Sequence, residues 1–266
     1  MMLYPTIRSL SNMICEMNHK QLEIKRITKT ASLLILSGVT PNSIPQNIIQ
    51  RVLKEQHAEG GWISIVDTMW NAYFLELIDN KKYFKFINNA KKFLINNKNR
   101  DGLWGRSKRD ISRIPVTGIM LYLFPDLNSN NEIYKLEKLW ESEINSLVYK
   151  AGYTLMAFKV NNYIPTNKNI IEITCEWLMD NQRNDGGFAP WLNHPIDSDV
   201  FCTSIATLGL LQYHNENFVS KEILKKSYSW LLKNRLKSGV WKYHEIEDGA
   251  SWGVFTLSQL NKIGIF

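Results

Sequence analysis

One short motif recurs four times in this chain and limits its fold more than any other feature. Each copy follows a helical segment, turns at a glycine and reaches an aromatic residue, and a more apolar helical segment comes next. The copies are 55–62, 97–105, 181–188 and 234–241. Glycine suits such a turn because it adopts positive φ values without steric cost. The motif therefore predicts a fold built from repeated pairs of helices.

The spacing of the turns predicts how many pairs there are. Trp104 and Phe188 are about twice as far apart in sequence as Trp62 and Trp104, so we expect one degenerate copy between them, near Lys150–Tyr153. Six pairs would close a ring, with the second helix of each pair inside. We therefore expect an all-α (α/α)6 toroid formed by residues 1–266 as one domain.

Helical periodicity runs through nearly the whole chain, so almost no sheet is expected. The expected segments are 4–18, 22–37, 45–56, 68–77, 83–97, 114–123, 132–146, 151–160, 168–181, 198–213, 221–233 and 250–260. The second segment of each pair is short, apolar and rich in small residues, such as Ser204, Ala206 and Gly209. These are the properties that an inner ring of helices requires.

Acidic residues gather where the expected inner helices begin, and in a ring these helix ends meet at one mouth. They are Asp67, Asp110, Asp197, Asp199 and Asp248. A single aspartate at a helix start is explained by capping and by the helix dipole. Capping is sufficient for Asp67, Asp110 and Asp248. One cap does not need both Asp197 and Asp199, so these two are the candidate catalytic carboxyls.

The stretch from the third turn to these carboxyls resembles a known family. In squalene–hopene and oxidosqualene cyclases and class II diterpene cyclases, a Gly-Gly-Phe turn leads into an Asp-x-Asp-Asp signature. Here Gly186-Gly187-Phe188 leads into Asp197-Ser198-Asp199-Val200. The other turns resemble the QW repeats of these enzymes, whose (α/α)6 barrels are also found in protein prenyltransferase β subunits. Val200 departs from the signature, as the oxidosqualene branch also does.

This resemblance implies a class II terpene cyclase, an isomerase of isoprenoid biosynthesis that protonates and cyclises a linear isoprenoid or prenyl diphosphate. Asp199 would be the general acid, and Asp197 its neighbour, whose charge disfavours ionisation of both carboxyls. No metal is needed for the acid step, although Mg²⁺ could accompany a diphosphate. Class II cyclases normally place the cavity between two barrels. This chain has residues for one, so a second barrel subunit or a homodimer could complete the site.

The cation formed by protonation needs a π-rich wall without basic groups. The candidate aromatic residues are Trp62, Trp70, Phe188, Trp191, Trp241 and Trp252. Core or turn packing is the alternative role for each. Trp191 and Trp252 are the strongest candidates because they lie close to the start of an inner helix. His194 could orient the two carboxyls by hydrogen bonding or could have only a structural role in its loop.

Three other functions remain open. The barrel could bind a lipid or a partner protein without catalysis, since the fourth acid and the second barrel are missing. It could be a zinc-dependent prenyltransferase β-like subunit with ligands from Asp197, Cys202 and His244, although no Asp-x-Cys pair occurs. It could also cyclise a peptide or another non-terpenoid natural product.

Charge and cysteine content limit the partners and the compartment. The net charge is +7, and the basic residues are scattered. A solvated surface accounts for them, and attraction to a diphosphate or a peripheral membrane contact are the functional alternatives. No nucleic-acid motif occurs, so we expect no nucleic-acid partner. Cys15, Cys175 and Cys202 are irregularly spaced, as expected for reduced, buried thiols of a cytoplasmic protein.

Overall fold

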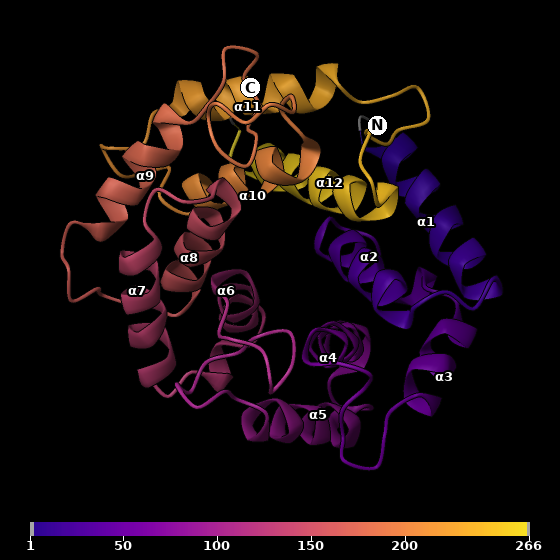
Figure 1. The fold of residues 1–266 in the computed structure, drawn as a ribbon. Helices are drawn as coiled ribbons and strands as arrows, with labels where there is room; N and C mark the ends of the chain where they lie inside the picture. Colours follow the sequence, from indigo (N-terminus) through magenta and orange to yellow (C-terminus); the bar gives the residue numbers. More distant parts are fainter. Residues whose placement is uncertain (1–2, 265–266) are drawn as a thin grey trace.

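A computed structural model describes residues 3–264, and within this range the chain forms twelve α-helices, two short 3-10 helices and no strand. The outer helices are α1 (Tyr4–His19), α3 (Gln46–Lys54), α5 (Phe84–Asn96), α7 (Asn131–Glu143), α9 (Ile170–Asp180) and α11 (Lys221–Lys233). The inner helices are α2 (Ile24–Leu36), α4 (Ile65–Asp79), α6 (Ile114–Leu123), α8 (Val148–Val160), α10 (Val200–Leu211) and α12 (Ile246–Lys262). Figure 1 shows the two concentric rings, which confirm the expected all-α toroid. The 3-10 helices are η1 (Pro41–Ser43) and η2 (Pro125–Leu127).

The inner and outer helices differ in the share of their surface that is buried. In α10 every residue except Phe201 is buried, whereas α3 buries only Ile48, Ile49 and Val52. A helix that is apolar on all sides must lie inside the molecule, and an amphipathic helix lies at its perimeter. The hydropathy of each segment thus determines its place in the ring.

The four glycine turns share one backbone geometry. Gly60, Gly102, Gly186 and Gly239 have φ values of 91°, 84°, 88° and 90°. In each turn the amide three residues before the glycine donates to the carbonyl of the residue after it, at 2.8–3.0 Å. This backbone conformation is costly for side chains other than glycine, which explains why the motif retains glycine.

Three of the turn aromatics tie their turn to the preceding outer helix. The indole N–H groups of Trp62, Trp104 and Trp241 donate to the carbonyl ten residues earlier in the chain, at 3.1, 2.8 and 2.8 Å. Phe188 occupies the same position in the third turn and is fully buried. A buried indole N–H needs such a partner. These aromatics therefore pack the turns.

The degenerate copy expected near Lys150–Tyr153 was misplaced. These residues lie in the first turns of α8, and the link from α7 runs through 144–147. There Asn145 has a φ of 66°, and asparagine tolerates this region better than most residues. The helix pair exists as expected, but the positive φ in its link belongs to an asparagine and not to a glycine.

Helices α8 and α10 approach each other closely at two glycines. A Cβ atom on Gly152 would lie 2.4 Å from the carbonyl oxygen of Ile205, and one on Gly209 would lie 2.7 Å from the Cα atom of Gly152. Backbone atoms cannot yield as a flexible side chain can. The contact therefore depends on the absence of side chains at both positions.

Replacing Gly152 with alanine is expected to lower the free energy of unfolding by up to about 2 kcal/mol. Overpacking usually costs about 1–3 kcal/mol, and alanine regains about 1 kcal/mol of this through its higher helix propensity. Urea denaturation of both proteins measures the difference. A denaturation midpoint equal to or above that of the wild type would contradict the close approach.

Local hydrogen bonds and ion pairs account for two of the aspartates at the mouth of the ring, and neither residue is the N-cap of its helix. Ser64 caps α4 by accepting the Asp67 N–H at 3.1 Å, and its hydroxyl donates to the Asp67 carboxylate. Asp110 precedes α6 and pairs with Arg113 at 2.7 Å. Asp67 thus takes part in the capping of α4. The capping expected for Asp110 was wrong, because the N-cap of α6 is Arg113 and no side chain caps that helix.

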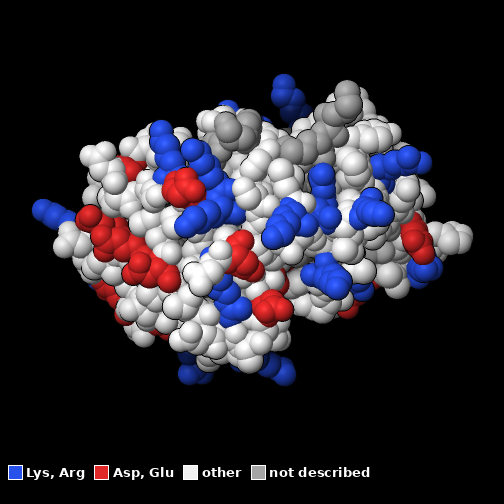
Figure 2. Space-filling view, turned by 90° about the horizontal axis from the view of Figure 1, so that it is seen from above, with Lys and Arg blue, Asp and Glu red and all other residues white. Residues whose placement is uncertain are grey.

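The charged side chains, the apolar character of the helices and the state of the cysteines can each be compared with the sequence expectations. Figure 2 looks down on the α11 side of the ring and shows Lys and Arg side chains distributed among uncharged residues. None of the described helices combines the length and apolar character of a membrane span. Cys175 and Cys202 are buried as expected, whereas Cys15 is exposed, and all three are free.

Candidate active site

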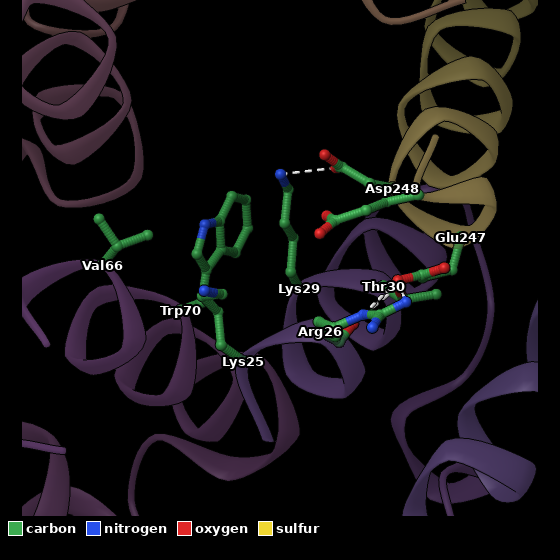
Figure 3. Close-up of a pocket in the computed structure, with 9 residues that line it drawn as sticks. Lys25, Arg26, Lys29, Thr30, Val66, Trp70, Glu247 and Asp248 are labelled. Carbon is green, nitrogen blue, oxygen red and sulfur yellow. Dashed lines mark hydrogen bonds and ion pairs between the residues drawn. The ribbon is translucent and has the colours of Figure 1, made fainter. Parts of the chain in front are cut away.

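A cavity opens at the mouth of the ring. It consists of two adjoining hollows of about 230 and 190 Å³ that share Lys29, Val66, Trp70 and Asp248. The first hollow is also lined by Lys25, Arg26, Thr30, Glu245 and Glu247. The second is also lined by Met69, Pro115, Val116, Ile119, Tyr149, Tyr153 and Phe201. The cavity therefore has a charged side, which Figure 3 shows, and an aromatic side.

The aromatic hollow lies where the inner ring is most loosely packed. Helices α4 and α6 contact each other less than the other neighbouring inner helices do. Their first two turns supply Trp70 and Val116 to the hollow, and α8 and α10 supply Tyr153 and Phe201. Four inner helices thus build one apolar wall, as in many ligand pockets.

An ion pair lies at the boundary between the two sides. Lys29 Nζ of α2 is 2.6 Å from Asp248 Oδ1 of α12. The same ammonium lies 5.6 Å from the ring centroid of Trp70 and 5.8 Å from that of Trp252. The two indoles meet edge to face, 6.2 Å apart. A carboxylate and two indole faces therefore surround one positive charge.

Asp199 is the N-cap of α10, where its carboxylate accepts the Cys202 N–H at 2.8 Å. Burial raises the pKa of Asp199 above its ordinary value. Hydrogen bonds from the Cys202 amide and thiol and from the Phe201 amide lower it, as does the charge of His244, but burial has the larger effect. The carboxyl thus keeps its proton more readily than an exposed aspartate does.

Asp197 is exposed, and it shares with Asp199 a groove of about 580 Å³ beside the end of α11. The groove is also lined by Ile196, Ser198, Trp230, Lys233, Asn234, Arg235, Leu236, Trp241 and Lys242. The largest cause of the raised Asp199 pKa is burial and not the second carboxyl. In this structure the groove is open to water, which weakens the interaction between the two charges.

Phe201 and Tyr243 lie near both Asp199 and the cavity. Their rings stack with centroids 6.0 Å apart, and Phe201 lines the aromatic hollow. Burial raises the pKa of Tyr243, and the charges of Asp199 and Asp248 raise it further. Tyr243 is thus close enough to both carboxyls to respond to their charges.

Val200, which replaces the fourth acid of the signature, is completely buried. Its Cγ1 and Cγ2 atoms occupy the space in which Cβ atoms on Gly249 and Gly253 would lie, at 2.5 and 3.0 Å. The side chain at this position packs α10 against α12. A carboxylate here would be buried without the space or the partners that it needs.

Arg183 organises the loop that precedes the carboxyls. Its guanidinium donates to the carbonyls of Leu192, Ile196 and His194, at 3.1, 2.8 and 2.5 Å. The His194 ring accepts the Ile196 N–H at 3.2 Å and meets Trp191 edge to face, 4.2 Å apart. Trp191 is 42% exposed. The structure thus places His194 and Trp191 in loop packing.

Of the aromatic candidates from sequence, Trp70 lines the cavity. Trp252 is completely buried and meets Trp70 edge to face. Trp62, Phe188 and Trp241 lie in the turns, and Trp191 lies on the surface loop. Sequence reasoning missed Lys29 and treated Asp248 as a cap. It also missed Tyr153 and Phe201, which could have been found by asking which large side chains fall in the first turns of the inner helices.

The described residues contain no group of three or more His, Cys, Asp or Glu side chains that could hold a metal ion. The zinc alternative needs Asp197, Cys202 and His244 at one point, and the described residues do not form such a group. Cys202 is buried, whereas Asp197 and His244 are exposed.

Solved structures with the same fold include a terpene cyclase. The type II terpene cyclase MstE from Scytonema, without ligand, superposes with a TM-score of 0.75 at 13% sequence identity, covering 98% of each chain. A variant of MstE in complex with its substrate geranylgeranyl dihydroxybenzoate gives a TM-score of 0.72 at 13% identity, covering 98% of this chain and 99% of that one. This chain therefore has the terpene cyclase toroid, as its sequence implied.

Other comparisons are more distant. A possible member of the GH105 family from Klebsiella pneumoniae gives a TM-score of 0.62 at 11% identity, covering 98% of this chain and 93% of that one. Protostadienol synthase A from Arthroderma gypseum is 24% identical over 102 residues, which are 35% of this chain and 14% of that protein. No protein-family model matches the sequence. The fold is thus established, and the reaction must be argued from the site.

Proposed function

We propose that this protein is a class II-type terpene cyclase in which the carboxyl of Asp199 protonates a linear isoprenoid and starts its cyclisation. The observation that carries the proposal is a partly buried carboxyl with a raised pKa at the start of an inner helix of this toroid. A proton donor must be protonated before the substrate arrives, and burial favours that state. The complex of MstE with a geranylgeranyl compound supports an isoprenoid substrate.

The proposed step is an isomerisation. Asp199 transfers its proton to one carbon of a terminal double bond, whose π electrons form the new C–H bond. The adjacent carbon becomes a cation, and the π electrons of the next double bond close the ring. Loss of a proton from a neighbouring carbon to solvent restores a double bond, and Asp199 regains its proton from water. No bond to a head group breaks.

A partner that covers the groove would help Asp199 to keep the proton that it donates. Asp197 and Asp199 interact weakly while water fills the groove, because a high dielectric screens their charges. A second barrel, a second copy of this chain or the substrate itself would exclude that water. Asp197 would then raise the pKa of Asp199 further. Asp199 lines the groove and Trp70 lines the cavity, so the substrate would have to reach past Phe201 and Tyr243. Trp70 and Trp252 would then face the resulting cation, at about 0.5–2 kcal/mol for each ring.

The test is the source of the new hydrogen. The protein is incubated in deuterium oxide with prenyl diphosphates and squalene-like polyenes, and products are analysed by mass spectrometry. A cyclic product with one deuterium bound to carbon is expected. Release of diphosphate without deuterium on carbon would show that ionisation starts the reaction. Binding without any product would favour the noncatalytic lipid- or partner-binding alternative.

A further inference from the structure

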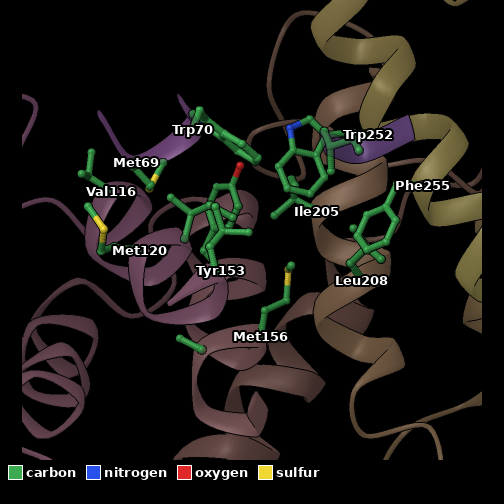
Figure 4. Close-up of a cluster of buried hydrophobic side chains, with 14 of the residues drawn as sticks. Met69, Trp70, Val116, Met120, Tyr153, Met156, Ile205, Leu208, Trp252 and Phe255 are labelled. Atoms are coloured by element: carbon green, nitrogen blue, oxygen red, sulfur yellow. The ribbon is translucent and has the colours of Figure 1, made fainter. Parts of the chain in front are cut away.

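The cavity already holds a positive charge on its aromatic side. Lys29 Nζ is flanked by Trp70 and Trp252 and paired with Asp248 at 2.6 Å. Figure 4 shows the two indoles beside Tyr153, whose ring centroid is 6.0 Å from that of Trp252. The side chains of Lys29 and Asp248 are only 19% and 16% exposed. The ammonium therefore occupies a largely desolvated cage.

These are the features by which proteins recognise organic cations. An indole presents the most negative face of any side chain, and the attraction grows when the cation is removed from water. Asp248 adds a fixed negative charge at the same point. The π faces of the indoles repel anions as they attract cations. The cage therefore favours a positively charged group over an anionic head group.

We propose that Trp70, Trp252 and Asp248 form a subsite for a positively charged organic group, and that Lys29 occupies this subsite when no ligand is bound. The identification of the natural occupant as the cation of the cyclisation rests on the proposed function. The preference of the subsite for an alkylammonium ligand does not, because it follows from the cage alone.

The ammonium of Lys29 has a second carboxylate within its surroundings, to which it could move. The charged hollow beside the cage contains Glu245, which is exposed, and Glu247, which pairs with Arg26 at 2.6 Å. Lys25 lies there too and pairs with Glu23 at 3.4 Å. The flexible stem of a lysine lets its ammonium exchange one carboxylate for another. A ligand that enters the cage can thus displace Lys29 toward Glu245.

The experiment removes the resident ammonium and measures what replaces it. Lys29→Met keeps the approximate length of the side chain without its charge, so the cage loses its charged occupant. Binding of hexyltrimethylammonium is measured by calorimetry for the wild type and the variant. We expect the variant to bind about tenfold or more tightly, because the ligand no longer competes with Lys29 for the indoles and Asp248. In the variant that combines Lys29→Met with Asp248→Asn, this gain should be lost.

Controls separate charge from apolar character and from misfolding. The neutral 1-hexanol should bind the wild type and Lys29→Met equally. If Lys29→Met does not fold, Lys29→Gln is used, since its amide can still donate to Asp248. A smaller gain is then expected, because the neutral amide competes for Asp248 less strongly than the ammonium does. An unchanged affinity for the ammonium, a gain that survives Asp248→Asn, or an equal gain for 1-hexanol would each overturn the proposal.

The outcome is independent of turnover. If the ammonium binds as expected and no substrate is cyclised, the subsite stands and the cyclase proposal fails. If a substrate is cyclised and the variants bind the ammonium alike, the cyclase proposal stands and the subsite fails.

Discussion

Replacing Asp199 with asparagine is expected to lower kcat for cyclisation by about 10²–10⁴-fold, the usual contribution of general acid catalysis. The amide has nearly the shape of the carboxyl but carries no proton that it can donate to an alkene. Its oxygen can still accept the Cys202 N–H that caps α10. The free energy of unfolding should therefore change by no more than about 0.5 kcal/mol. Product formation and urea denaturation measure the two quantities separately.

Asp197→Asn is the matched control, since the same substitution lies in the same groove two residues away. It should lower kcat by less than Asp199→Asn, because it removes a neighbouring charge and not the donor. The raised pKa of Asp199 also determines the pH profile. Activity should be constant at pH values below this pKa and fall as the pH rises through it, because only the protonated form donates. Cyclic product from Asp199→Asn at the wild-type rate would remove this residue from its role.

Replacing Glu137 with alanine is expected to lower the free energy of unfolding by about 3–5 kcal/mol. Glu137 lies in α7 and is completely buried. Its carboxylate accepts the amides of Thr166 and Asn167, at 2.9 and 2.8 Å, and the hydroxyls of Thr166 and Tyr163. Alanine would leave these donors without an acceptor and detach the segment between α8 and α9.

The same carboxylate predicts how this loss depends on pH. Burial acts to raise the pKa of Glu137, but the hydrogen bonds from Thr166, Tyr163 and Asn167 together outweigh it and lower the pKa to about 2. A carboxyl with a folded pKa below its unfolded value stabilises the protein above the unfolded pKa and loses this effect as the pH falls through the folded one. Urea denaturation should therefore show a smaller difference between the wild type and Glu137→Ala at pH 3 than at pH 7.

Glu141→Ala is the control for this substitution. Glu141 lies one turn further along α7 and pairs with Lys138 at 2.7 Å near the surface. Such pairs contribute little, so a change of at most about 1 kcal/mol is expected. Equal losses in the free energy of unfolding from Glu137→Ala and Glu141→Ala would show that the buried hydrogen bonds of Glu137 stabilise the protein no more than a surface ion pair does.

Much of the fold could be predicted from periodicity because the inner and outer helices differ so strongly in hydropathy. The bounds of α6 and α11 agree with the expected segments residue for residue. Helices α4 and α12 begin earlier than expected, at Ile65 and Ile246. Their first turns carry polar residues such as Asp67, Glu247 and Asp248, which face the mouth of the ring and therefore resemble a loop in sequence.

The candidate site could be predicted less completely, and the reasons are physical. The position of Asp199 before an inner helix follows from local sequence. The Lys29–Asp248 pair joins α2 to α12, and only closure of the ring brings these segments together. Periodicity assigns Trp70 and Trp252 to inner helices but does not say which neighbour each will face. In the turns, only the structure distinguishes an indole that bonds to a carbonyl ten residues back from one that lines a cavity.

The shared turn geometry has a consequence for how such rings diversify. After each turn aromatic, the chain crosses to its inner helix through a connector, and the connectors differ greatly in length: 63–64, 105–113, 189–199 and 242–245. The frame on either side of them is held by bonds that repeat from turn to turn. New chemistry can therefore arise by lengthening or rewriting a connector while the architecture is inherited unchanged.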